Sequence, residues 1–224
     1  YFGENLNGLL WAKRDSLTGI INGINYDEWN SATDTFIEKN YNLRNIISGK
    51  RENKLALQRQ FGLEENPDKF LVGMVTRLTG QKGLDLVECV MDNIFENGDI
   101  QMIILGTGEN QYENMLRHFE WKYKGSLASL IMFDNAASHK IYAGCDAFLM
   151  PSLFEPCGLS QMISMRYGTL PIVRETGGLR DSVEAFNEFE DKGTGYSFTN
   201  YNAHEMLGIL NYAKRTYYDN RKAW

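Results

Sequence analysis

Short apolar runs alternate with amphipathic stretches along most of this chain. Buried strands are predicted by continuously apolar runs over residues 70–75, 102–105, 130–133, 147–150 and 170–173. Between these runs, apolar side chains recur at helical spacing, which predicts helices over residues 84–94, 112–119, 136–143 and 159–167. Fully apolar strands separated by helices are typical of a parallel sheet that is covered on both faces. We therefore expect an α/β fold with a doubly wound, Rossmann-like parallel sheet.

The two ends of the chain are less regular. Residues 18–24 have the composition of a strand that runs into a turn, and residues 51–61 show helical spacing. A last helix is predicted to start at Asn202, which is a favoured N-cap, with Glu205 as the partner of a capping box. The sequence begins without an initiator Met and stops soon after this helix, so we expect it to be cut from a longer polypeptide.

The charge balance argues against a nucleic acid as partner. Acidic residues outnumber basic ones by 29 to 23, giving a formal net charge of −6, and nucleic-acid-binding domains usually show the opposite balance. An anionic ligand would therefore need a local cluster of basic side chains. Because no apolar run approaches the roughly 20 residues of a membrane helix, no membrane partner is expected.

Cysteine and histidine usage favours neither a disulfide framework nor a metal centre. The three cysteines are widely spaced and odd in number, which favours a reducing compartment such as the cytoplasm. The three histidines show no metal-ligand spacing, and we expect them to be surface or capping residues. We therefore predict no metal and no cofactor.

Two cations, Arg77 and Lys82, lie on the predicted loop that follows the strand over residues 70–75. Ligands of doubly wound sheets bind at the carboxyl ends of the strands, which is where this loop starts. Arg supplies a planar fork of donors and Lys a mobile point charge, so together they suit a diphosphate. The alternative is two solvated charges in a polar loop.

A second loop follows the strand over residues 147–150 and carries Glu155, Cys157 and Gly158 before the next helix. Backbone amides at the start of a helix attract anions, and Gly158 removes side-chain bulk there, which favours a phosphate site. Glu155 is placed to accept hydrogen bonds from sugar hydroxyls. The alternative is a tight turn with a carboxylate that stabilises only the helix start.

Paired glycines mark a third loop. Thr176, Gly177 and Gly178 follow a strand and precede a predicted helix, and the glycines allow the backbone to approach a ligand closely. A plain turn would look the same. The Gly-Thr-Gly over residues 106–108 is a weaker signal, because no complete Gly-x-Gly-x-x-Gly follows it. The sequence also lacks Gly-Lys-Ser/Thr, so it favours neither a dinucleotide oxidoreductase nor a P-loop enzyme.

Taken together, residues 77–83, 154–159 and 167–179 resemble the C-terminal half of bacterial glycogen synthases and plant starch synthases. Residues 18–30 are similar to the segment that leads into the second domain of these enzymes. The resemblance covers nearly the whole chain, in the order and spacing of the family. It implies that the expected parallel sheet is one half of a GT-B fold, in which two Rossmann-like domains face each other across a cleft.

The resemblance implies transfer of glucose from ADP-glucose to the non-reducing 4-hydroxyl of an α-1,4-glucan, with retention of the anomeric configuration. Residues 1–224 would be the domain that binds the nucleotide sugar, with residues 1–30 as the connection between domains. The N-terminal domain, which binds the glucan, would be missing, so the isolated chain is expected to be inactive. The implied compartment is the bacterial cytosol, or a plastid for a plant-type enzyme.

The site residues of the family carry over onto matching positions. Arg77 and Lys82 match its diphosphate-binding pair, and Glu155 matches the carboxylate that holds the glucose hydroxyls, so these three are the predicted catalytic residues. Phe133 falls where the family commonly has a Tyr that stacks on adenine, and a core Phe is the alternative. The predicted substrate-binding residues are Phe133, Cys157, Gly158, Leu159, Ser160, Thr176, Gly177 and Gly178.

Other functions stay open at this point. Ile163 departs from broader retaining relatives, which carry there a Glu that contacts ribose. The isolated chain could be a nucleotide-binding module without activity, or part of a related GT-B enzyme such as a sucrose synthase or a nucleotide-sugar epimerase. The motifs over residues 154–159 and 167–179 favour the glycogen and starch synthases over those enzymes.

Overall fold

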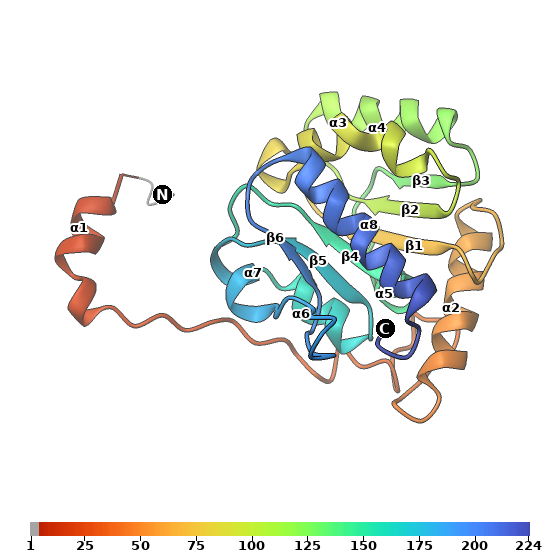
Figure 1. The fold of residues 1–224 in the computed structure, drawn as a ribbon, viewed down its shortest axis with the longest axis horizontal. Coiled ribbons are helices and arrows are strands. Elements are labelled where there is room, and N and C mark those ends of the chain that lie inside the picture. Colours follow the sequence, from red (N-terminus) through yellow and green to blue (C-terminus); the bar gives the residue numbers. More distant parts are fainter. Residues whose placement is uncertain (1–4) are drawn as a thin grey trace.

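The computed structural model describes residues 5–224, and residues 1–4, the start of the predicted interdomain connection, lie outside that range. Within it, six parallel strands form one sheet (Figure 1). The strands are β1 (Phe70–Val75), β2 (Ile100–Leu105), β3 (Leu127–Leu130), β4 (Ala147–Met150), β5 (Leu170–Arg174) and β6 (Tyr196–Phe198). Their order is β3-β2-β1-β4-β5-β6, which confirms the expected doubly wound topology.

Helices cover both faces of this sheet. The helices of the domain are α2 (Ile46–Gln60), α3 (Leu84–Phe95), α4 (Asn110–Lys122), α5 (Asn135–Gly144), α6 (Ser160–Arg166), α7 (Gly177–Ser182) and α8 (Ala203–Asp219), with the short 3-10 helix η2 (Gly80–Lys82). The helix α1 (Asn7–Ala12) and the 3-10 helix η1 (Arg14–Ser16) precede the domain and bury no residue. One buried cluster packs beneath α3, α4 and α8, and another beneath α2, α5 and α6. None of the helices described in residues 5–224 is long and apolar enough to cross a membrane.

Three predicted strands differ from the structure by two residues or more. The strand predicted over residues 102–105 is β2, which begins two residues earlier, at Ile100. The strand predicted over residues 130–133 is β3, which lies three residues earlier at Leu127–Leu130. Residues 131–133 lie beyond the end of the strand, where their apolar side chains face solvent or a cavity instead of the core. The strand predicted over residues 18–24 is wrong, because this segment has no regular secondary structure.

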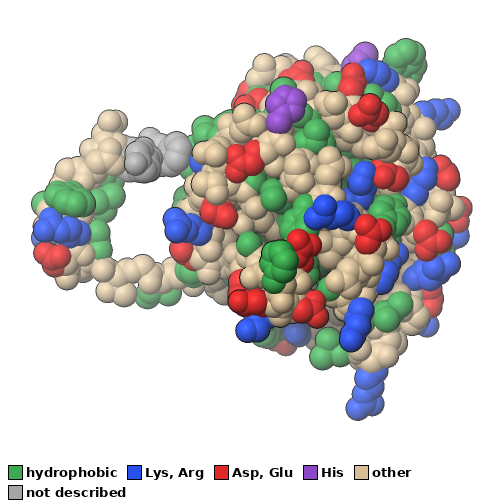
Figure 2. Space-filling model, in the orientation of Figure 1, with side chains coloured by type: hydrophobic (Ala, Val, Ile, Leu, Met, Phe, Trp, Pro, Cys, Tyr) green, Lys and Arg blue, Asp and Glu red, His purple; other side chains and the backbone are tan. Residues whose placement is uncertain are grey.

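The N-terminal segment is separate from the body of the domain. Residues 5–23 are exposed throughout, and Figures 1 and 2 show α1 standing away from the sheet. The body begins near Trp29, which stacks on His139 with ring centroids 4.1 Å apart. His139 is buried, so the expectation that it is a surface or capping residue is wrong.

Asp34 explains why His139 is buried. Its Oδ2 lies 2.7 Å from Nδ1 of His139 and accepts the hydroxyl of Tyr167 at 2.5 Å. Burial alone would raise the pKa of Asp34, but hydrogen bonds from His139 and Tyr167 outweigh it and lower that pKa. This cluster fixes the start of the body to α5 and to the end of α6.

Asn202 is the N-cap of α8, as predicted, and its side chain accepts the amides of His204 and Glu205. The predicted capping box is incomplete, however. Glu205 accepts the amides of Thr199 and Asn200, at 2.7 and 3.1 Å, instead of the amide of Asn202. The glutamate therefore fixes the loop before the helix.

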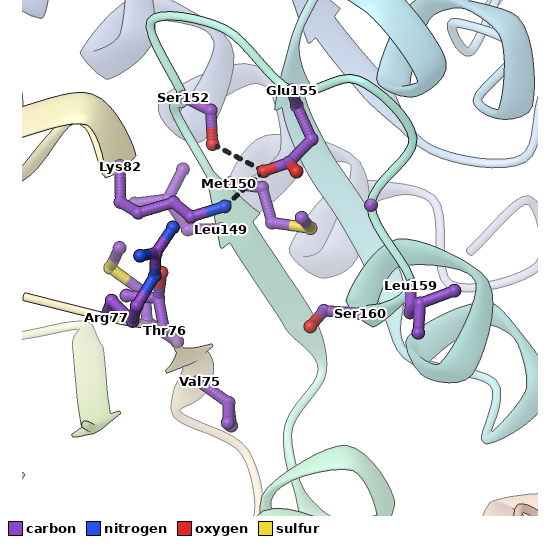
Figure 3. A pocket seen from close by; sticks show the side chains of 12 residues that line it. Val75, Thr76, Arg77, Lys82, Leu149, Met150, Ser152, Glu155, Leu159 and Ser160 are labelled. Carbon is purple, nitrogen blue, oxygen red and sulfur yellow. Dashed lines mark hydrogen bonds and ion pairs between the residues drawn. The ribbon is translucent and has the colours of Figure 1, made fainter. Parts of the chain in front are cut away.

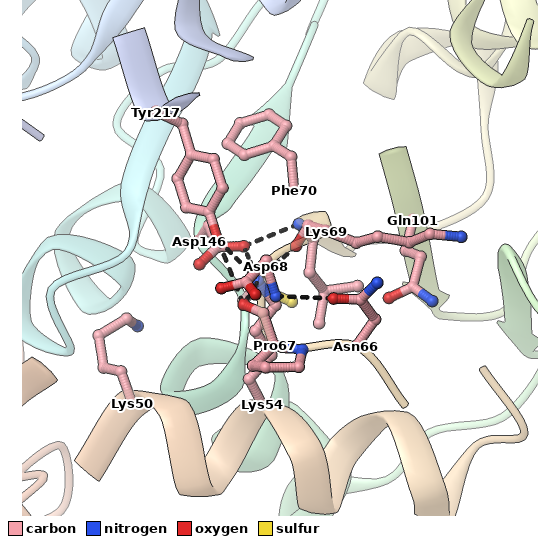
Figure 4. A network of polar contacts seen from close by, with 12 residues as sticks. Lys50, Lys54, Asn66, Pro67, Asp68, Lys69, Phe70, Gln101, Asp146 and Tyr217 are labelled. Carbon is pink, nitrogen blue, oxygen red and sulfur yellow. Dashed lines mark hydrogen bonds and ion pairs between the residues drawn. The ribbon is translucent and has the colours of Figure 1, made fainter. Parts of the chain in front are cut away.

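A buried lysine, Lys54 of α2, is enclosed at the amino ends of β1 and β4 (Figure 4). The acceptors around its Nζ are Asp146 Oδ2 at 2.6 Å, the Pro67 carbonyl at 2.9 Å, the Tyr217 hydroxyl at 3.0 Å and the Lys69 carbonyl. An ammonium group has three N–H donors, so the protein itself satisfies this charge completely.

Candidate functional site

β1 and β4 lie side by side at the point where the strand order reverses. In doubly wound sheets the loops at such a point diverge and leave a crevice for a ligand. The loop after β1 carries Arg77 and Lys82, and the loop after β4 carries Glu155. The structure thus brings the three predicted catalytic residues to one place (Figure 3).

A cavity of about 240 Å³ opens between these loops. The predicted site residues that line it are Arg77, Lys82, Glu155, Gly158, Leu159 and Ser160. Thr76 and Ser152 line it as well, and sequence reasoning missed them. The signal that could have found them is their position, since each lies within two residues of the end of a strand.

Lys82 and Glu155 form an ion pair beside this cavity. Nζ of Lys82 lies 2.5 Å from Oε2 of Glu155, and the two side chains are 17% and 10% exposed. The hydroxyl of Ser152 also approaches this oxygen, at 3.4 Å. A carboxylate this enclosed is costly without a partner, so the pair fixes where both charges point.

Arg77 brings a second positive charge to the same cavity. Its side chain is exposed, and Figure 3 shows the guanidinium group directed toward Lys82. Among the described residues that line the cavity, Glu155 is the one carboxylate against these two cations. Acidic and basic side chains are mixed over the face seen in Figure 2, and acidic residues outnumber basic ones in the whole sequence, so the positive excess at this cavity is local. Such a cavity suits an anionic ligand.

Gly83 allows the loop after β1 to touch the loop after β4. Its φ is 79°, and a Cβ there would lie 2.3 Å from the carbonyl oxygen of Pro151. Gln81 joins the same loops. Its carbonyl accepts the amide of Leu153 at 2.9 Å, and its side chain donates to the carbonyl of Phe154 at 2.5 Å. The two charged loops are therefore held together by bonds to the backbone.

The other predicted substrate-binding residues near Glu155, which are Cys157, Thr176, Gly177 and Gly178, do not line this cavity. The amide of Gly178 donates to the carbonyl of Glu155 at 3.0 Å, and a Cβ on Gly178 would lie 2.3 Å from the carbonyl oxygen of Cys157. Gly177 has a φ of 45°, and a Cβ there would lie 2.1 Å from the carbonyl oxygen of Glu155. Thr176 is the N-cap residue of α7. These residues support the loop, and their contact with substrate stays a prediction.

Gln161 fixes the turn before α6. This side chain is buried, and its Nε2 donates to the carbonyls of Cys157 and Gly158, both at 3.0 Å. Gly158 has a φ of 73°, which favours glycine, in line with the turn predicted there. Sequence reasoning missed the role of Gln161, because the spacing of residues along the chain does not show that this side chain points back toward the loop.

A second cavity, of about 250 Å³, adjoins the first, since Val75, Thr76 and Arg77 line both. Phe133 lines this second cavity and is 92% exposed. The alternative of a core Phe is therefore wrong. The shift of β3 leaves the ring at the carboxyl edge of the sheet, three residues beyond the strand.

The Gly-Thr-Gly over residues 106–108 shapes the second cavity. A Cβ on Gly106 would lie 1.8 Å from the carbonyl oxygen of Thr76, so a larger residue would not fit there. The amide of Leu78 donates to the carbonyl of Thr107 at 2.9 Å. The loop after β2 thus packs directly against the loop that carries Arg77.

Comparison with known proteins places this chain and its fold in a family. A sequence profile described as "Glycosyl transferases group 1" matches residues 56–223. The chain belongs to this family. The chain is 59% identical over 224 residues to a glycogen synthase from Lachnospira eligens, and 54% identical to one from Lachnoclostridium phytofermentans. It spans about half of these relatives, 47% of each.

A solved structure resembles this chain over nearly its whole length. It is the catalytic domain of starch synthase IV from Arabidopsis thaliana, bound to ADP and acarbose. The TM-score is 0.90 at 37% identity, and the match covers 99% of this chain and 46% of the other. The expected Rossmann-like half of a GT-B fold is confirmed, and so is the resemblance to glycogen and starch synthases.

Proposed function

We propose that this chain is the nucleotide-sugar-binding domain of a glycogen or starch synthase. The full-length protein would transfer glucose from ADP-glucose to the non-reducing 4-hydroxyl of an α-1,4-glucan, with retention of configuration. One observation carries the proposal: Arg77, Lys82 and Glu155 meet in one cavity, in a chain 59% identical to a glycogen synthase over 224 residues. The chain spans about half of that relative, so we assign acceptor binding to residues outside it.

The two adjoining cavities suit the two ends of ADP-glucose. Arg77 and Lys82 bind the diphosphate through charge-assisted hydrogen bonds. Glu155 accepts hydrogen bonds from the glucose hydroxyls, while the exposed ring of Phe133 stacks on adenine. The starch synthase IV structure was solved with ADP, which supports ADP as the nucleotide.

The proposed chemistry follows from where charge develops. Negative charge grows on the diphosphate as its bond to glucose breaks, and donors that bind this charge more strongly in the transition state lower the barrier. Arg77 and Lys82 are such donors. Glu155 is already paired with Lys82, which makes it a poor nucleophile. We therefore favour departure and attack on the same face of the sugar, with the leaving phosphate accepting the proton of the acceptor hydroxyl.

The same proposal covers cofactors and partners. Two cationic side chains supply the positive charge that a metal would otherwise bring, so no metal or other cofactor is assigned. The partners are ADP-glucose, ADP and the glucan acceptor, with no nucleic acid and no membrane. The proposed compartment is the bacterial cytoplasm, or a plastid for a plant-type enzyme.

A transfer assay tests this proposal against a non-catalytic binding module and against a sucrose synthase. Labelled ADP-glucose and glycogen are incubated with the full-length protein or with the 224-residue chain, and fructose replaces glycogen in a parallel reaction. We expect labelled polymer from the full-length protein, and ADP binding without transfer from the chain alone. Labelled sucrose in place of polymer would overturn the proposal, and polymer labelling by the chain alone would contradict the assigned division of roles.

A further inference from the structure

Arg174, at the end of β5, has no role in the binding mode described above. Its Nη1 donates to the carbonyl of Leu153 at 2.7 Å and lies 3.5 Å from the carbonyl of Ser152. Its Nε is buried and has no hydrogen-bond partner among the described residues. The linings of the two cavities, as far as residues 5–224 define them, leave Arg174 out. A charged donor directed at successive carbonyls restrains the backbone that carries them.

The backbone that Arg174 restrains leads directly to Glu155. Ser152 offers its carbonyl to Arg174 and its hydroxyl to Oε2 of Glu155. On the other side, the carbonyl of Glu155 accepts the amide of Gly178 at 3.0 Å. The direction of the Glu155 carboxylate therefore depends on the conformation of the residues that Arg174 holds.

Tyr201 extends this contact to the loop that carries Lys82. Its ring centroid lies 5.6 Å from the guanidinium carbon of Arg174. Its hydroxyl lies 2.5 Å from Oδ1 of Asp85 and 3.0 Å from the carbonyl oxygen of Gly80. Arg174 and Tyr201 thus brace both charged loops from behind the cavity.

We propose that Arg174 is a positioning residue for sugar recognition. It holds the backbone of Ser152 and Leu153 so that Glu155 presents its carboxylate to the glucose of the bound donor. This inference rests on the proposed function and adds to it a residue that touches neither the nucleotide nor the sugar. Its effect is exerted on the glucose end of the donor and not on the diphosphate end.

The test compares two ligands. Calorimetric titrations of the chain with ADP and with ADP-glucose give two affinities. The affinity for ADP-glucose divided by the affinity for ADP isolates the sugar contact, because ADP lacks the glucose. Arg174→Met keeps much of the stem but removes the donors. We expect ADP-glucose to bind about three- to tenfold more weakly relative to ADP, within the range of couplings in one network. Arg174→Lys keeps a charged donor group, so its ratio should lie close to that of the wild-type chain.

A double-mutant cycle separates positioning from general support of the fold. In the Glu155→Gln background, Arg174→Met should leave the ratio unchanged, because the carboxylate that it positions is gone. Arg51 is an exposed arginine of α2, paired at 3.8 Å with Asp68. Arg51→Met is the matched control and should leave both affinities unchanged.

The proposal is overturned if Arg174→Met weakens ADP and ADP-glucose equally, or if it changes the ratio just as much without Glu155. If circular dichroism shows that Arg174→Met does not fold, Arg174→Gln replaces it. This variant keeps a neutral donor and should lower the ratio by about twofold, and an unchanged ratio overturns the inference. A wild-type chain that binds neither ligand contradicts the proposed function, and this inference falls with it.

Discussion

Two lysine–carboxylate pairs lie at opposite ends of β1 and β4, and their surroundings differ. At the amino ends, Lys54 is 3% exposed and bonds to Asp146, to a tyrosine hydroxyl and to backbone carbonyls (Figure 4). At the carboxyl ends, Lys82 bonds to Glu155 beside an open cavity that also holds Arg77 (Figure 3). A lysine whose donors are all satisfied by the protein has none left for a ligand. The same chemical pair is therefore structural at one edge of the sheet and suited to ligand binding at the other.

The largest expected effect is on stability. Lys54→Met leaves the carboxylate of Asp146 buried without its charged partner, and among the described residues the amide of Leu71, at 2.8 Å, is the donor that remains. This loss should lower the free energy of unfolding by about 3–5 kcal/mol. Lys82→Met should lower it by less, about 1–3 kcal/mol, because the freed Glu155 lines an open cavity and keeps the hydroxyl of Ser152 within 3.4 Å. Urea denaturation followed by circular dichroism measures both. Equal losses from the two variants would remove the distinction between the pairs.

Catalysis should depend on the two cations of the first cavity, Arg77 and Lys82. In the full-length protein, Arg77→Ala and Lys82→Ala should each lower kcat by about 10²–10³, the range for removing one donor from developing negative charge. Lys124 is an exposed lysine on the turn after α4. Lys124→Ala is the control and should leave kcat unchanged. A near-parental kcat in Arg77→Ala or Lys82→Ala would show that the assigned role of that residue is wrong.

The second cavity adds a smaller effect that does not depend on charge. Phe133→Ala should weaken ADP binding by about tenfold, since stacking of a base on an aromatic ring is worth roughly 1–3 kcal/mol. Phe133→Tyr keeps the ring and should be nearly neutral. Phe189 is similarly exposed but lies outside both cavity linings, so Phe189→Ala is the matched control. Unchanged ADP affinity in a folded Phe133→Ala variant would rule out stacking.

The smallest expected effect is a gain in ADP affinity, whereas the preceding substitutions are expected to cause losses. Glu155→Gln frees Lys82 from its internal partner, so ADP should bind about two- to fivefold more tightly, as for a modest gain in one hydrogen bond. ADP-glucose should gain less or lose affinity, because the sugar contact is weakened, and turnover should fall. Calorimetric titration measures both ligands. Equal weakening of ADP and ADP-glucose would contradict the assignment of Glu155 to the sugar.

The two pairs also show what the sequence can predict. Arg77, Lys82 and Glu155 each follow an apolar run within a few residues, so their place at the carboxyl edge follows from the strands alone. Lys54 and Asp146 are 92 residues apart, and only the packing of α2 against the start of β4 brings them together. Arg174 was hidden for the same reason, since its target carbonyls belong to a different loop.

Strand bounds were predictable only where the apolar run faces the core. β1 and β4 match their predicted bounds, because their side chains are buried on both faces of the sheet. The apolar run at residues 130–133 combines two kinds of position. Leu130 is buried in the core, whereas Met132 and Phe133 line a cavity. Hydrophobicity alone does not distinguish a core position from a ligand-facing one, so the strand was placed three residues too late.

The most direct test of the contrast between the two pairs is a calorimetric titration of the Lys82→Met chain with ADP. If Lys82 binds the diphosphate, this variant should remain folded and bind ADP about tenfold or more weakly, as expected for losing a hydrogen bond from a charged group. If Lys82 only supports the fold, as Lys54 does, a folded Lys82→Met chain will bind ADP with unchanged affinity. That result would contradict the account of the cavity as a diphosphate site.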